Sequence, residues 1–137
     1  MKWTYLLFAG LLSNAIFAQD SAFKKWTQFQ YKKSVENLLD NIARPDTRKG
    51  FVIAAPSKSN PNYYYHWVRD AALVMETFRE AFPFERYAPM FRDYINLVDH
   101  HQKVDKLTGQ GEVKFNPNGT SFKGPWGRPQ NDGPALR

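Results

Sequence analysis

Glycine and proline divide this chain of 137 residues into a helical part and a part that has no helical period until its last few residues. Six of the eight glycines and four of the nine prolines lie after Leu107. Because glycine weakens a helix and proline breaks it, we expect helices before this point and a long loop after it. A loop of this length is uncommon inside a compact domain unless it has a function. The sequence therefore predicts an all-α fold with one long Pro/Gly-rich functional loop.

Three segments before Leu107 have the apolar spacing of a helix. The first is expected from Asp20 or Ser21 to about Ala43, the second from near Trp67 or Arg69 to about Phe82, and the third over roughly 84–104. The expected buried residues are Tyr31, Val35, Leu38, Leu39 and Ile42 in the first helix, Leu73, Val74, Thr77, Phe78 and Ala81 in the second, and Phe91, Ile95 and Val98 in the third.

Two shorter elements complete the expected order. Residues 51–55 form a brief apolar run that predicts an extended segment, and the loop 56–62 follows it. Residues 132–136 combine Asp, Gly and Pro in the manner of a helix cap and first turn. We therefore expect a fourth helix to begin there.

The first 18 residues have the features of a secretory signal peptide. Lys2 gives a positive start, the run from Tyr5 to Leu12 is nearly all apolar, and Ala18 is a small residue suited to signal peptidase. We expect cleavage after Ala18, a mature chain of residues 19–137, and a secreted or periplasmic location. An N-terminal membrane anchor is the alternative, but it would need an apolar run of about 20 residues.

Composition limits the classes of partner. Apolar residues make up 42% of the chain, which is enough for a core. The net charge is +6, and it is +5 without residues 1–18, from 18 basic and 13 acidic residues. These basic residues are scattered and form no concentrated stripe, so binding to nucleic acid is not expected. The absence of cysteine excludes thiol chemistry and most structural zinc sites.

Two segments, residues 63–70 and 124–137, combine aromatic rings with side chains that hold hydroxyl groups. Rings cover the apolar faces of a sugar, and charged groups form hydrogen bonds about twice as strong as neutral ones. The candidates are the rings of Tyr63, Trp67 and Trp126 and the polar groups of Arg69, Asp70, Arg128 and Asp132. The pattern favours a sugar pocket over the simpler alternative of core aromatics beside a surface ion pair.

Other candidate sites stay open or are set aside at this point. Glycoside hydrolysis needs two carboxyl groups, and spacing does not choose among Asp70, Glu112 and Asp132. His100 and His101 are adjacent, so they point to different sides of a helix. We expect both histidines at a surface or interface, and we expect no metal site. Residues 118–120 fit the N-glycosylation pattern, although a plain Asn-Gly turn is favoured there.

Four motifs, in this order, resemble the N-terminal part of the glucoamylases of glycoside hydrolase family 15. They are residues 51–57, with the sequence FVIAAPS; residues 63–73, YYYHWVRDAAL; residues 111–116, GEVKFN; and residues 126–137, WGRPQNDGPALR. The resemblance extends from about Trp26 to Arg137. It departs from the family at Val113, where proline is usual, and at His66, Pro125 and Asn131.

The resemblance implies both a fold and an activity. The fold would be an (α/α)6 toroid, in which the helices expected above are the opening ones. The activity would be the release of glucose from the non-reducing ends of starch, glycogen or malto-oligosaccharides, with inversion, without a cofactor, and by a monomer. The implied substrate-binding residues are Tyr63, Trp67, Arg69, Asp70, Trp126 and Arg128.

Both catalytic glutamates of this family lie downstream of the WGRPQ motif. The resemblance therefore implies an acid and a base beyond Arg137, and Asp70, Glu112 and Asp132 are not promoted to these roles. An open part of a toroid would expose apolar helix faces, so we do not expect the isolated chain to be a stable monomer. The alternatives are a non-catalytic sugar-binding protein, an inactive fragment, or a family member that acts on another alpha-glucoside such as trehalose.

Overall fold

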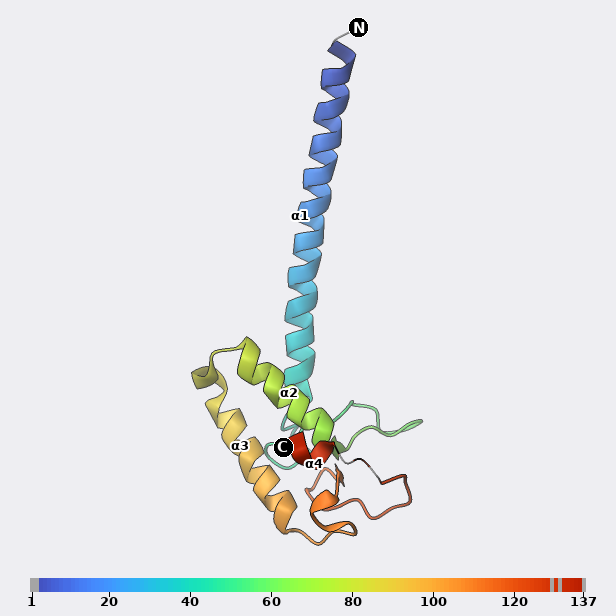
Figure 1. The fold of residues 1–137 in the computed structure, drawn as a ribbon, viewed down its shortest axis with the longest axis vertical. Coiled ribbons are helices and arrows are strands. Elements are labelled where there is room, and N and C mark those ends of the chain that lie inside the picture. Colours follow the sequence, from blue (N-terminus) through green and yellow to red (C-terminus); the bar gives the residue numbers. More distant parts are fainter. Residues whose placement is uncertain (1–2, 129, 131, 137) are drawn as a thin grey trace. The chain divides into compact units, whose positions relative to one another are not determined.

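The computed structural model describes residues 3–128, 130 and 132–136 (Figure 1). Its elements are α1 (Trp3–Asp40), β1 (His66–Trp67), α2 (Val68–Ala81), α3 (Phe84–Lys103), the 3-10 helix η1 (Gly109–Gly111), β2 (Lys114–Phe115) and α4 (Gly133–Leu136). The chain divides into two compact units, residues 1–37 and residues 38–137. The second unit contains every element from β1 onward.

The first helix begins earlier than the sequence predicted. It starts at Trp3 and ends at Asp40, so Asp20 and Ser21 lie inside it and do not cap it. The apolar run before Ala18 contains no proline, and leucine and alanine favour the helix on both sides of this point. Cleavage after Ala18 stays a prediction. Among the residues with described structure, no helix is both long and apolar enough to cross a membrane.

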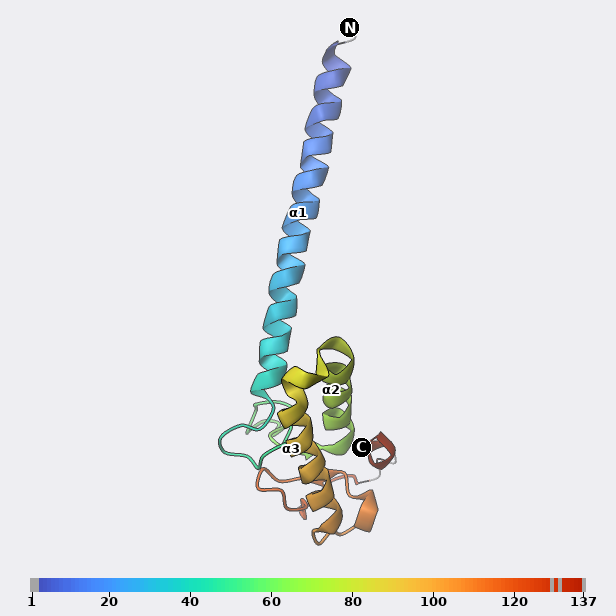
Figure 2. The same cartoon turned by 90° about the vertical axis from the view of Figure 1, so that its left-hand side faces the viewer.

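Helices α2 and α3 are joined at Pro83 and pack against each other (Figures 1 and 2). Their bounds agree closely with the predicted ones. Proline at this junction cannot donate a backbone hydrogen bond, which ends α2 and begins α3. Asp70 lies in the first turn of α2, and Arg79 in its last turn. Both charges suit the dipole of the helix.

The buried faces of these two helices were predicted only in part. In α2 the prediction was correct at Phe78 and wrong at Leu73, whose side chain is 52% exposed. The residues buried instead are Val68, Ala71, Ala72 and Met75. In α3, Ile95 is exposed, while Phe91 and Val98 pack partly against the core. The small alanine side chains allow neighbouring segments to approach α2 closely on this face. The spacing of apolar residues along the helix does not reveal which face these segments contact.

Residues 51–53 form the predicted extended segment and connect the two parts of the core. Phe51 and Ile53 point into one cluster, with Tyr64, Val68, Leu97 and Phe115. Val52 points into the other, with Ala71, Met75 and Tyr94. Alternate residues of an extended chain face opposite sides, so one short segment serves both clusters.

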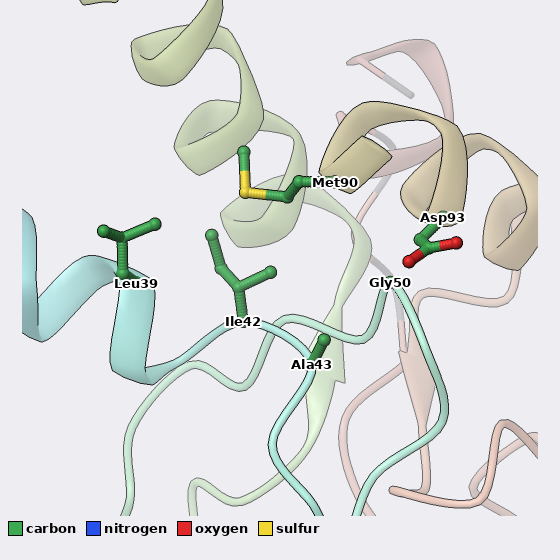
Figure 3. A pocket seen from close by; sticks show the side chains of 6 residues that line it. All are labelled: Leu39, Ile42, Ala43, Gly50, Met90 and Asp93. Carbon is green, nitrogen blue, oxygen red and sulfur yellow. The ribbon is translucent and has the colours of Figure 1, made fainter. Parts of the chain in front are cut away.

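Gly50 allows this segment to pass beneath α3. Its φ is +76°, and a Cβ atom there would lie 2.2 Å from the backbone oxygen of Asp93. Figure 3 shows the adjoining pocket of about 270 Å³, which is lined by Leu39, Ile42, Ala43, Gly50, Met90 and Asp93. Only glycine avoids both the strained φ and the contact with α3.

The long loop after Leu107 is organised by a small antiparallel sheet. His66 pairs with Phe115 and Trp67 with Lys114, and this pairing holds the loop against the start of α2. The favoured Asn-Gly turn is present, since Asn118 Oδ1 accepts hydrogen bonds from the backbone N and the Oγ1 of Thr120 at 3.1 and 2.7 Å. The short α4 begins at Gly133 as predicted.

The expected surface position of His101 was wrong. Its side chain is 1% exposed and stacks on the ring of Phe115, with 3.7 Å between centroids. It also lies edge-on to His66, at 5.0 Å between centroids. The imidazole ring is packed here as a flat aromatic group. His100, by contrast, is half-buried.

Candidate functional site

Five of the six predicted substrate-binding residues line one pocket of about 340 Å³, here called the Trp126 pocket. Its lining consists of Ala54, Tyr63, Trp67, Arg69, Asp70, Trp126, Gly127 and Gln130. They come from the residue after the extended segment 51–53, from the residues around β1, from the first turn of α2 and from the Pro/Gly-rich loop. The fold thus brings together the two segments that the sequence singled out.

Alternation along residues 63–67 places the rings of the pocket. Tyr64 and His66 point into the core, whereas Tyr63 is 48% exposed and Trp67 is half-buried on the other side. The backbone is held by hydrogen bonds from Ala54 N to Tyr65 O and from Ala55 N to Tyr63 O, at 3.0 and 3.2 Å. The rings of Tyr63 and Trp67 then lie 5.8 Å apart. The rings of Tyr63 and Trp67 therefore stay outside the core and form one wall of the pocket.

Arg69 lies between two carboxylates at the start of α2. Its Nη1 donates a hydrogen bond to Asp132 Oδ2 at 3.2 Å, and its Nη2 lies 3.8 Å from Asp70 Oδ2. All three charged side chains keep part of their surface in solvent. They can therefore offer one donor fork and two acceptors to a bound molecule.

Two polar atoms of the pocket-lining residues have no protein partner among the described residues. Trp126 Nε1 and Gln130 Oε1 are shielded from solvent and form no hydrogen bond within the described part of the chain. A buried polar group without a partner costs about 1–3 kcal/mol. One of these atoms is a donor and the other an acceptor. A hydroxyl group both accepts and donates, so it is the kind of group that could satisfy either atom.

Arg128 is placed differently from the other predicted residues. It is not among the described residues that line the pocket, and its Nη2 donates to the backbone oxygens of Phe122 and Gly124 at 2.9 and 3.0 Å. Its Nε lies 3.8 Å from Oε2 of the fully buried Glu112. These contacts brace the loop that carries Trp126. A contact of Arg128 with substrate stays a prediction.

The three candidate carboxylates occupy distinct surroundings. Asp70 lines the pocket, Asp132 bonds to Arg69, and Glu112 is buried, where its Oε2 accepts a hydrogen bond from Thr108 Oγ1 at 3.2 Å. No group of three or more histidine, aspartate or glutamate residues in the described ranges is placed to hold a metal ion.

Sequence reasoning missed Ala54, Gly127 and Gln130 as lining residues. Gly127 and Gln130 lie within the WGRPQ motif, so the motif carried a signal for them. Ala54 carried none, since it reaches the pocket only through the backbone pairing with residues 63–65.

Comparison with known proteins gives this site a family context. The family model described as "Glycosyl hydrolases family 15" matches residues 29–137. "Probable glucoamylase" of Schizosaccharomyces pombe is 38% identical over 98% of this chain and 34% of its own length. "Glucoamylase, intracellular sporulation-specific" of Saccharomyces cerevisiae is 36% identical over 85% of this chain and 24% of its own length.

Solved structures agree with these relatives. The glucoamylase from Saccharomycopsis fibuligera matches 83% of this chain and 27% of its own, with a TM-score of 0.73 and 38% identity. The Hormoconis resinae glucoamylase matches 84% of this chain and 22% of its own, with a TM-score of 0.77 and 35% identity. The chain therefore spans about a third or less of these proteins.

The structural matches confirm the predicted fold class, the opening helices of an α/α toroid. The family model covers most of the chain, including both segments that form the Trp126 pocket. The chain therefore belongs to glycoside hydrolase family 15.

Proposed function

We propose that this protein releases glucose from the non-reducing ends of starch, glycogen or malto-oligosaccharides by inverting hydrolysis, and that the Trp126 pocket binds the terminal glucose unit. The observation that carries this proposal is the convergence of Tyr63, Trp67, Arg69, Asp70 and Trp126 on one cavity. The proposal also draws on the family, because other family 15 members are named glucoamylases.

The size and lining of the pocket support a single sugar unit as ligand. Its volume of about 340 Å³ lies near the lower end of the usual range for small-molecule sites, about 300–1,000 Å³. The rings of Tyr63, Trp67 and Trp126 offer flat apolar surface for the faces of a pyranose. Arg69 and Asp70 offer a donor and an acceptor for neighbouring hydroxyls, as charge-assisted hydrogen bonds.

Asp70 is assigned a binding role and no acid or base role. Its carboxylate faces the Arg69 guanidinium at 3.8 Å, an arrangement suited to accepting hydrogen bonds from hydroxyls. An inverting glycosidase needs a protonated carboxyl at the leaving oxygen and a carboxylate that activates water on the opposite face of the ring. By the family resemblance, two glutamates beyond Arg137 would supply these groups.

Export is part of the proposal. Residues 1–18 are proposed to direct secretion and to be removed after Ala18. One relative is named as intracellular, so family membership does not decide location. Determination of the N-terminal residue of the protein recovered from outside the cytoplasm tests the point: glutamine at position 19 is expected, and a retained Met1 would refute cleavage.

The test of the activity is Asp70→Asn in the complete polypeptide that the gene encodes, assayed on maltose and maltotriose. The loss of two hydroxyl contacts should raise the barrier by about 2–4 kcal/mol, so kcat/KM should fall by roughly 30- to 1,000-fold. Asp99→Asn is the matched control, because Asp99 pairs with Lys103 on the exposed side of α3. This control should retain the wild-type kcat/KM.

Product analysis separates the proposal from its rivals. Glucose released as the β-anomer from maltotriose is the expected product. Hydrolysis of trehalose in preference to maltose would move the protein to another alpha-glucoside, and sugar binding without hydrolysis would favour a non-catalytic protein. Normal kinetics of the Asp70→Asn variant would refute the assignment of Asp70 even if the activity itself were present.

A further inference from the structure

Lys114 lies among four aromatic rings, two of which also line the Trp126 pocket. Its Nζ is 3.8 Å from the ring centroid of Phe122 and 4.0 Å from that of Tyr65. The centroids of Trp67 and Trp126 follow at 5.0 and 5.2 Å. All four distances are within the range of about 6 Å at which a cation is attracted to the face of a ring. We call these four rings and the lysine the Lys114 cage.

The local fold forces Lys114 into this position. Lys114 pairs with Trp67 across the two-stranded sheet, and Phe122 N donates to Lys114 O at 3.0 Å. Tyr65 lies edge-on to both Trp67 and Phe122, with centroids 5.6 and 5.1 Å apart. Three segments that are distant in sequence thus meet around one ammonium group.

The cage holds a charge without a carboxylate beside it. The residue is 8% exposed, and no ion pair or hydrogen bond of Nζ is found among the described residues. Burial and the charge of Arg128 both lower the pKa of Lys114. Burying an ammonium group is costly, and attraction to several desolvated rings offsets part of that cost.

Two rings of the cage also line the pocket, and two do not. Trp67 and Trp126 belong to the cage and also line the pocket, whereas Tyr65 and Phe122 belong to the cage alone. The ammonium therefore connects the ring on β1 with the ring on the Pro/Gly-rich loop. A cation between them fixes their spacing, because displacement of either ring weakens its attraction to the charge.

We propose that Lys114 is a positioning residue, whose ammonium holds Trp67 and Trp126 at the spacing that the sugar-binding wall requires. This proposal rests on the proposed function for its consequence in sugar binding, although the cage itself does not depend on it. Lys114 acts through the rings and is not assigned any contact with substrate. The wall should loosen when the charge is removed, even if the volume of the side chain is kept.

The experiment compares wild type, Lys114→Met and Lys114→Arg in the complete polypeptide. Methionine keeps the apolar stem and removes the charge, and arginine keeps the charge. Lys103→Met is the matched control, because Lys103 is exposed on α3 and pairs with Asp99. Two readouts are needed: near-UV circular dichroism with acrylamide quenching of tryptophan in the absence of sugar, and KM and kcat for maltotriose.

Lys114→Met should change the near-UV spectrum, increase quenching and raise KM about tenfold, with a smaller change in kcat. Lys114→Arg should keep the spectrum, the quenching and KM close to their wild-type values, because it retains the charge. Lys103→Met should leave all three unchanged. Phe122→Leu serves if Lys114→Met does not fold, because it removes a ring of the cage that does not line the pocket. It should shift the same signals in the same direction.

The two proposals fail in distinguishable ways. If wild type neither binds nor hydrolyses any alpha-glucoside, the proposed function fails, while the spectra still report on the cage. If wild type is active and the folded Lys114→Met and Phe122→Leu variants keep its spectrum, quenching and KM, the positioning role is overturned.

Discussion

Within the part of the chain that the structure describes, the Trp126 pocket can be compared with a second pocket of nearly equal size that also combines aromatic rings with charged side chains. The Trp126 pocket has a volume of about 340 Å³. The second, here called the Asp46 pocket, has about 330 Å³ and is lined by Asp46, Lys58, Asn62, Tyr64, Tyr65, Asn116 and Pro117. Size and residue type do not separate these two pockets. The difference lies in what their polar atoms already bind.

Polar groups in the Asp46 pocket are largely paired with each other. Asp46 accepts hydrogen bonds from the Tyr64 hydroxyl through Oδ1 and from Lys58 Nζ, at 2.8 Å, through Oδ2. Lys58 Nζ also lies 4.1 Å from the centroid of the Tyr64 ring, over its face. The Asn116 amide donates to Thr120 Oγ1 and to the backbone oxygen of Ser121. A ligand entering here would have to break these contacts.

The residues that line the Trp126 pocket are less completely paired by the protein. Trp126 Nε1 and Gln130 Oε1 lack protein partners in the described part of the chain. Aromatic and charged residues together thus do not identify a sugar site. We propose that donors and acceptors left unpaired by the protein are the better indicator of a binding site, and the following predictions test that proposal.

Tyr64→Phe, in the Asp46 pocket, should have the largest effect on stability. The Tyr64 side chain is buried and its hydroxyl bonds to the Asp46 carboxylate. Loss of a hydrogen bond to a charged group that remains partly in solvent should lower the free energy of unfolding by about 1–2 kcal/mol. Urea denaturation checks the value, and kcat/KM on maltotriose should not change. A large loss of activity with normal stability would place substrate in the Asp46 pocket.

A smaller and opposite effect is expected from Gln130→Met. The two side chains are similar in size, and Gln130 Oε1 has no hydrogen-bond partner to lose among the residues that the structure describes. Removal of this acceptor should therefore leave the free energy of unfolding unchanged or slightly higher. In the bound state one neutral hydrogen bond would be lost, so kcat/KM should fall by about 2- to 10-fold. Unchanged kinetics would show that Gln130 Oε1 does not meet the substrate.

The sequence could predict the pocket because most of its residues are local neighbours. Tyr63, Trp67, Arg69 and Asp70 lie in eight consecutive residues, where period-two alternation followed by a helix start sets their directions. Residues 126–130 form one motif. The helix bounds around Pro83 were equally local, because proline ends one helix and begins the next.

Features that depend on contacts between distant segments were missed. Leu73 and Ala71 are both apolar, and only the packing of residues 51–53 and α3 on α2 decides which of the two is buried. His101 is buried because Phe115, from the loop, stacks on it. The Lys114 cage likewise needs rings from two segments that are distant in sequence, residues 65–67 and residues 122–126. Apolar spacing within one helix carries no information about such partners.

The smallest effect expected is in acid, and it concerns the Asp46 pocket alone. Lys58 and then the Tyr64 hydroxyl, through hydrogen bonds, lower the pKa of Asp46 from 3.8 to about 2. Because the folded pKa is below the ordinary one, this carboxylate stabilises the fold above about pH 4, and the contribution disappears as pH falls to about 2. Lys58→Met should remove most of this pH dependence of unfolding by urea, since Lys58 is the largest cause of the shift. Tyr64→Phe should remove less of it. Equal acid sensitivity in wild type and Lys58→Met would show that the ion pair in the Asp46 pocket does not hold in solution. Paired polar groups would then no longer distinguish the Asp46 pocket from the Trp126 pocket.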